Sequence, residues 1–184
     1  MGSLASFFTA KAGGLADVSA ALVSALLDQG ADVHVALPDY RAIFSDRLVP
    51  FLKEEITSIQ RKMPDDRVHL AEDRAFFYIN RVYSKYGDEN IKLALAFQRE
   101  VINNIIPRVQ PDLIHCNDWM TFRAGMNAKK VSGKPLIVHV HATEFDRTGG
   151  NGVNQHVYDI EREGMQNADL IITVSNYVKD NAIK

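Results

Sequence analysis

The sequence predicts an α/β fold, a single doubly wound domain in which short parallel strands alternate with helices. Three observations lead to this prediction. Helical and strand-like segments alternate along the 184 residues, as they do in α/β proteins. The strand-like segments are short and apolar on both faces, like buried parallel strands. Polar side chains follow several of these strands, at the end where open α/β sheets bind ligands.

The composition supports a folded domain and argues against nucleic acid or an anionic membrane as a partner. Apolar residues make up 46% of the chain and charged residues 24%, which favours a real core over disorder. The net charge of −2 gives no reason to expect a nucleic-acid or anionic-membrane partner. No apolar run approaches the roughly 20 residues that span a bilayer, and the start lacks the features of a signal peptide. The single cysteine, Cys116, excludes an internal disulfide and suits a reducing compartment, so we expect a cytoplasmic protein.

The segment 11–18 carries the most informative local pattern, two glycines after a lysine where a helix begins. Glycine has no Cβ, so the backbone N–H groups of Gly13 and Gly14 can approach an anion closely. The helix N-terminus adds roughly half a positive charge, and Lys11 adds a full one. The pattern predicts a phosphate cradle, for example for a nucleotide sugar. A glycine turn packed tightly between a strand and a helix is the alternative, since neither the phosphate-loop pattern nor G-x-G-x-x-G is present.

Apolar spacing gives the expected elements in chain order. Helices are predicted over about 14–29, 89–106, 120–131, 153–165 and from 176 onward. Parallel strands are predicted over 32–38, 113–116, 136–140 and 170–174. Residues 67–70 and 75–80 are predicted to form the two short strands of a hairpin. Gly30 and Pro107 are expected to end the first two helices. Residues 1–10 hold little of a first strand.

Candidate site residues stand at the carboxyl ends of the later strands. Asp118 and Trp119 follow one strand, and His141 ends the next. A glycine-rich loop over 142–154 comes after His141, and an ion pair between its Asp146 and Arg147 is expected to order it. These positions and the glycine turn all fall at the edge where such sheets bind ligands.

The histidines of the chain do not form the pattern of a metal site, and a serine hydrolase motif is lacking. Four histidines lie in the second half of the chain, and two of them share a strand face by alternation: His115, His139, His141 and His156. Their spacing matches no zinc signature, and cysteine ligands are lacking. We therefore expect no metal. The G-x-S-x-G pattern of a serine hydrolase is absent.

Several motifs together resemble one enzyme family. Residues 11–18, KAGGLADV, resemble the KxGGLADV signature of bacterial glycogen synthases and plant starch synthases. Further matches follow in order: ALPDY at 36–40, YGDEN at 86–90, HCNDW at 115–119, and EGM at 163–165 with AD at 168–169 and TVS at 173–175. Asn117 replaces the second histidine of the family's HxHDW. Residues 141–150, HATEFDRTGG, differ from HNxxxQG and are closer to the broader retaining family that includes sucrose-phosphate synthases.

The resemblance implies a two-domain glycosyltransferase of the GT-B type. Residues 1–184 would be its N-terminal Rossmann-like domain, with the first strand truncated and the C-terminal nucleotide-binding domain outside the chain. The enzyme would transfer glucose from ADP-glucose or UDP-glucose to the non-reducing end of an α-1,4-glucan or malto-oligosaccharide, with retention and without a metal or other cofactor. This half alone would be inactive, because the cleft needs both walls.

The resemblance also implies roles for individual residues. The donor side would consist of Lys11, Gly13, Gly14 and Asp17; the reacting sugar would lie beside His141, with Lys11 also catalytic; the acceptor side would consist of Asp118, Trp119 and Tyr86. Each has a plainer alternative, such as packing for Trp119 and Tyr86, a structural histidine at His141, or a favourable charge near a helix N-terminus for Asp17. Two other functions stay open: a retaining GT-B enzyme with a small-sugar or lipid acceptor, and a non-catalytic carbohydrate-binding module.

Overall fold

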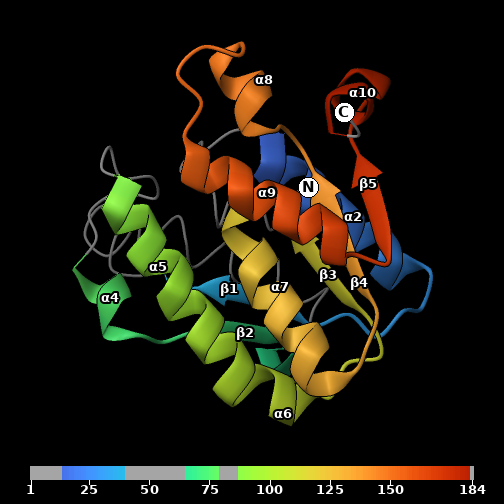
Figure 1. Ribbon diagram of the computed structural model, residues 1–184. Coiled ribbons are helices and arrows are strands. Elements are labelled where there is room, and N and C mark those ends of the chain that lie inside the picture. The colour runs from blue at the N-terminus through green and yellow to red at the C-terminus, as the bar shows by residue number, and fades with distance from the viewer. Residues whose placement is uncertain (1–13, 40–64, 79–86, 183–184) are drawn as a thin grey trace, which may run out of the picture. The chain divides into compact units, whose positions relative to one another are not determined.

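The computed structural model describes residues 14–39, 65–78 and 87–182 (Figure 1). The chain divides into two compact units, residues 1–89 and 90–184. Both units contain helices and parallel strands. This arrangement confirms the predicted α/β class, and parallel strands of this kind belong to Rossmann-like folds. That residues 1–184 form one domain stays a prediction.

The described part of the first unit begins with helix α2, Gly14–Asp28, which starts at the second glycine of the 11–18 segment, as predicted. The helix ends before Gly30, whose φ of +81° is the left-handed conformation that glycine adopts freely. Strand β1, Val35–Pro38, follows and pairs in parallel with strand β2, Val68–Ala71. A parallel pair of this kind needs a crossover between its strands.

The predicted hairpin over 67–80 is wrong. A short 3₁₀ turn, η2, Asp65–Arg67, leads into β2, whose partner is the parallel strand β1. The chain then forms helix α4, Arg74–Phe77, in place of a second hairpin strand. The reason is a cap: the Asp73 side chain accepts a 2.9 Å hydrogen bond from the backbone N–H of Ala75. This bond satisfies a donor of the first helical turn, which favours a helix over an extended strand.

The second unit is built on a parallel sheet in the order β3-β4-β5. Its strands are β3, Ile114–Asn117, β4, Leu136–Val140, and β5, Leu170–Thr173. Helices α7, Trp119–Ser132, and α9, Gln155–Asn167, connect them and lie in front of β3 and β4 in Figure 1. Helix α10, Asn176–Ala182, follows β5 and contacts it. All three strands therefore end at one edge of the sheet.

The core of this unit lies where α7 and α9 pack against β3 and β4. Phe122, Leu136 and Val138 are almost completely buried. Gly164 of α9 faces the ring of Phe122, and a Cβ added there would lie 2.5 Å from Cδ2 of that ring. The two helices approach this closely because Gly164 has no side chain. In β5, by contrast, Leu170 and Ile171 are exposed, so the expected burial of strands on both faces is wrong for this strand.

The predicted helix over 89–106 continues past Pro107, so the expectation that this proline ends it is wrong. It consists of α5, Gly87–Glu100, a π-helical turn η3, Val101–Ile105, and α6, Ile106–Val109. A proline inside an α-helix lacks an N–H and clashes with the carbonyl four residues earlier. A wider π turn before Pro107 accommodates such a ring. The helix ends instead at Gln110, whose φ is 49°. No helix in the described ranges has the length and apolar character needed to cross a membrane.

Candidate active site

The candidate site lies at the carboxyl edge of the second unit's sheet, where β3 and β4 end side by side. Asp118 follows β3, and its backbone N–H donates a 3.0 Å hydrogen bond to the carbonyl of His139 in β4. The Asp118 carboxylate in turn accepts a 2.9 Å hydrogen bond from the backbone N–H of His141. Asp118 therefore joins the ends of the two strands through both its backbone and its side chain.

The backbone of Asp118 adopts an uncommon conformation, with φ 58° and ψ 168°. Residues held in such sparsely populated regions cost on the order of 1–3 kcal/mol and cluster at functional sites. Burial raises the pKa of the Asp118 carboxyl, while the backbone N–H of His141, Arg147 and the backbone of Ala142 act in the opposite direction. The Asp118 carboxylate, held by a strained backbone, accepts hydrogen bonds that keep the chain after β4 in place.

Three histidine rings form a cluster beside Asp118, in which His139 and His141 are stacked and His115 is tilted against His139. The centroids of His139 and His141 are 4.4 Å apart, and those of His115 and His139 are 5.6 Å apart. This confirms that His139 and His141 share a face. Burial lowers the pKa of each ring, and a neighbouring histidine lowers it further. Nε2 of His141 lies 3.2 Å from Oδ1 of Asn117, the residue that replaces the family's second histidine.

A neutral His141 can donate from one ring nitrogen and accept at the other, which suits hydrogen bonding to a polar ligand such as a sugar. Within the described ranges, no three or more His, Cys, Asp or Glu side chains are placed to hold a metal ion.

The segment after His141 is more ordered than the predicted loop over 142–154. It contains a short helix, α8, Glu144–Thr148. Thr143 and Asp146 form a capping box at its start, in which each side chain accepts from the other's backbone N–H. Asp146 also accepts a 2.7 Å hydrogen bond from Asn181 of α10. These bonds hold the Asp146 carboxyl pKa below its ordinary value, although burial acts the other way.

The expected ion pair between Asp146 and Arg147 is wrong, because Arg147 binds two glutamates instead. Its guanidinium pairs with Glu144 of α8 and with Glu161 of α9. It also donates a 2.7 Å hydrogen bond to the carbonyl of Ala142, next to His141. The sequence prediction missed Glu161, which is 3% exposed. The spacing could have indicated it. Glu161 lies on the same face of its helix as Val157 and Gly164, which is the apolar face, and a carboxylate buried there needs a charged partner.

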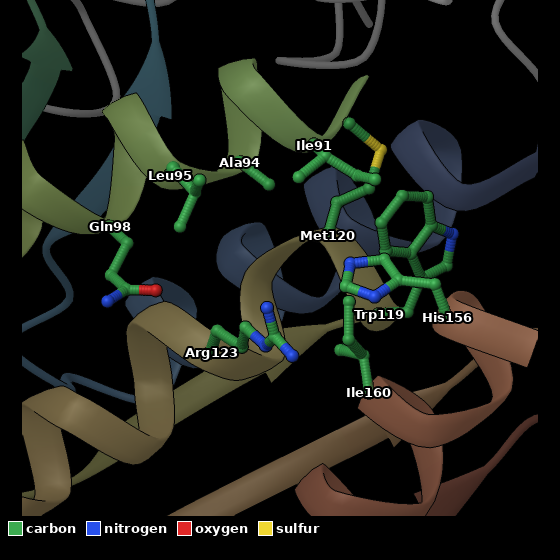
Figure 2. A pocket seen from close by; sticks show the side chains of 9 residues that line it. All are labelled: Ile91, Ala94, Leu95, Gln98, Trp119, Met120, Arg123, His156 and Ile160. Carbon is green, nitrogen blue, oxygen red and sulfur yellow. The ribbon is translucent and has the colours of Figure 1, made fainter. Parts of the chain in front are cut away.

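Trp119 lies in a different environment from Asp118 and His141. It lines a small hollow between α5, α7 and α9 (Figure 2). Apolar side chains form most of the wall, and Gln98, Arg123 and His156 contribute polar groups. Nε2 of His156 is buried and has no hydrogen-bond partner among the described residues. Asp118 and His141 do not line this hollow.

The structure thus brings two of the predicted site residues together, Asp118 and His141. Gly14 is the first residue of α2 and Asp17 lies in its first turn, both in the first unit. The remaining predicted residues lie outside the described ranges: Lys11, Gly13 and Tyr86.

Comparisons with known proteins agree on one family. The sequence profile of the starch synthase catalytic domain matches residues 4–183. Among curated proteins, a glycogen synthase of Moorella thermoacetica is 36% identical over 124 residues, which cover 61% of this chain and 25% of that protein. One of Geotalea daltonii is 29% identical over 154 residues, covering 74% and 31%.

A third relative is matched over most of this chain. The glycogen synthase of Lacticaseibacillus casei is 28% identical over an alignment of 214 positions, which covers 92% of this chain and 43% of that protein. The matched part of the chain therefore covers 25% to 43% of the length of these relatives. Since the profile matches nearly the whole chain, the chain belongs to the starch synthase catalytic domain family.

Proposed function

We propose that this chain is the N-terminal half of a glycogen or starch synthase of the GT-B type. The enzyme transfers glucose from ADP-glucose or UDP-glucose to the non-reducing end of an α-1,4-glucan, with retention. The observation that carries the proposal is the junction at the carboxyl edge, where the Asp118 carboxylate binds the backbone of His141 in a chain of this family.

The chemistry of this junction fits glucosyl transfer. Positive charge develops at the anomeric carbon as the nucleoside diphosphate leaves. His141 lies beside the reacting sugar in our proposal, and its neutral ring contacts the sugar. A group fixed before the reaction stabilises such charge without reorganising. Asp118 and Arg147 supply the fixation by binding the backbone on either side of this position.

The donor and acceptor contacts follow the family's motifs. Lys11, Gly13 and Gly14 face the diphosphate, where a lysine and helix-terminal amides favour negative charge, and Asp17 contacts sugar hydroxyls. Lys11 is also catalytic, because the diphosphate gains charge as it leaves. Asp118, Trp119 and Tyr86 line the acceptor side.

The other components of the proposed system follow from the same assignment. The partner of this half is a C-terminal nucleotide-binding domain, which supplies most nucleotide contacts, and no metal or other cofactor is needed. We place the enzyme in the cytoplasm, where nucleotide sugars are made and where a free, buried thiol such as Cys116 suits the reducing conditions.

The test uses the protein encoded by the complete native gene. Reading the gene past Lys184 should reveal a second α/β half. The purified enzyme should then transfer glucose from one of the two nucleotide sugars to maltohexaose, and NMR of the first product should show the α-configuration at the new bond. Transfer only to a small sugar phosphate or a lipid would favour the other retaining GT-B enzymes. Binding of maltohexaose without any transfer would leave a carbohydrate-binding module.

A further inference from the structure

Four backbone groups of the short segment from His141 to Glu144 bind side chains, and the carbonyl of Thr143 accepts from the backbone N–H of Arg147. Asp118 accepts from the N–H of His141, and Asp146 accepts from the N–H of Thr143 at 2.8 Å. Arg147 donates to the carbonyl of Ala142 at 2.7 Å. The N–H of Glu144 donates to the carboxylate of Glu161 at 2.8 Å. Because these backbone groups bind side chains instead of a neighbouring strand or helical turn, the side chains largely determine the backbone path of residues 141–144.

Arg147 connects the segment to helix α9. Three of its nitrogens have separate acceptors: the Ala142 carbonyl, Glu144 at 3.3 Å and Glu161. A planar guanidinium presents its donors in a fixed fork, so two carboxylates that hold it also orient the third donor. The position of the Ala142 carbonyl therefore depends on how Glu161 holds Arg147.

Glu161 is the deepest member of this arrangement. It is 3% exposed, and its two oxygens bind the guanidinium of Arg147 and the N–H of Glu144. A buried carboxylate is costly unless it is paired and hydrogen-bonded. Arg147 provides the pairing charge and the N–H of Glu144 provides the hydrogen bond, so Glu161 and the segment after His141 stabilise each other.

We propose that Glu161 is a positioning residue for glucosyl transfer: through Arg147 it fixes the Ala142 carbonyl, and thereby the backbone of His141. The role of His141 beside the sugar rests on the proposed function. The fixation of residues 141–144 by Glu161 is a property of the fold and is testable without any activity.

The first experiment measures that fixation in the 184-residue chain. Glu161→Gln keeps the size of the side chain but removes the charge that pairs with Arg147. Hydrogen exchange followed by mass spectrometry should show that amides in residues 141–144 exchange at least about 10-fold faster, as expected when a local hydrogen-bonded segment opens more often. Glu163→Gln is the matched control, because Glu163 lies on the same helix and is exposed. Equal exchange of residues 141–144 in the two variants would overturn the proposal.

The second experiment measures catalysis in the complete enzyme. Glu161→Gln should lower kcat by roughly 10- to 100-fold with little change in either KM, because small misplacements of a reacting group have effects of this size. In a His141→Ala background the same change should have almost no further effect, since a positioning residue acts through His141. An equal loss in both backgrounds would identify a general structural defect and overturn the proposal.

The two experiments separate the two hypotheses. If the complete wild-type enzyme transfers no glucose, the proposed function fails, while hydrogen exchange still decides whether Glu161 fixes residues 141–144. If exchange changes as expected but kcat of an active enzyme does not, the positioning role in catalysis is wrong and the proposed function stands.

Discussion

Asp118 binds the backbone N–H of His141 at 2.9 Å while holding its own φ at 58°, a value that few residues other than glycine adopt. The bond joins two parallel strands beyond their last ladder positions. The site is thus assembled at the cost of local backbone strain, a combination that is found at functional sites.

Replacing Asp118 with Ala should lower the free energy of unfolding by about 2–4 kcal/mol, since the lost hydrogen bond involves a charged acceptor and the backbone strain remains. Asp118→Asn keeps an acceptor oxygen and tolerates positive φ better than alanine, so its loss should be about half as large or less. Urea unfolding of the three proteins at pH 7 measures both values. Equal stabilities of the wild-type protein and the Ala variant would show that the carboxylate contributes no hydrogen bond of consequence.

The three clustered histidines should have pKa values below the ordinary value for histidine. Burial lowers the pKa of His115, His139 and His141, so each should have an NMR titration midpoint below 6.5 in the folded chain. The same chain in urea is the control, with midpoints near 6.5. Because the unfolded chain binds more protons at these rings, their contribution to stability is complete above about pH 6.5 and is lost as the pH falls below it. A folded midpoint at or above that of the unfolded chain would contradict the prediction.

Gly164→Ala should destabilise the second unit. The added methyl group would lie 2.5 Å from the Phe122 ring, which is 1% exposed and has little room to move. Overpacking lowers stability by about 1–3 kcal/mol, and the better helix propensity of alanine offsets up to about 1 kcal/mol of this loss.

The matched variant for this prediction is Phe122→Leu, which replaces the ring that the methyl group meets with a smaller and more adaptable aliphatic side chain. Combined with Gly164→Ala, it should give a smaller loss in urea unfolding than the sum of the two single changes. Simple addition of the two losses would show that the ring and the glycine do not constrain each other.

Trp119→Ala tests whether the hollow between α5, α7 and α9 belongs to the acceptor path. If the indole stacks on the acceptor, KM for maltohexaose in the complete enzyme should rise by roughly 10-fold or more, the effect of about 1.4 kcal/mol of lost binding. KM for the nucleotide sugar should change little. Arg123→Lys, a change in the same hollow that keeps the charge, is a comparison for general effects on this wall. Equal increases in both KM values would assign Trp119 to packing.

The sequence predicts most closely the elements that local patterns determine. Residues 136–140 form β4 as predicted, because the segment is mostly apolar and a turn with Gly133 and Pro135 precedes it. The predictions for 75–80 and Pro107 are wrong because other local structures form there. The Asp73 cap starts a helix in place of the strand, and a π-helical turn lets the helix continue through Pro107.

The candidate site shows a different limit of sequence prediction. Asp118 and His141 were predicted because they follow strands, and the position of a strand end is encoded locally. The partners of Arg147 were not, because Glu161 lies 14 residues away and meets the guanidinium only after α9 packs on the sheet. Long-range pairs of this kind depend on tertiary packing rather than on sequence spacing.

The sulfur of Cys116 in β3 lies against Gly125 of α7, so close that a Cβ added at Gly125 would clash with it. Burial raises the pKa of this thiol to about 12, so at neutral pH it carries almost no thiolate, the form that reacts with alkylating reagents. A maleimide therefore reaches the sulfur only when α7 lifts away from the strand. The rate of maleimide labelling therefore measures how often α7 separates from β3 in the unmodified protein. A glucan or nucleotide sugar whose binding stabilises the second unit would lower that rate.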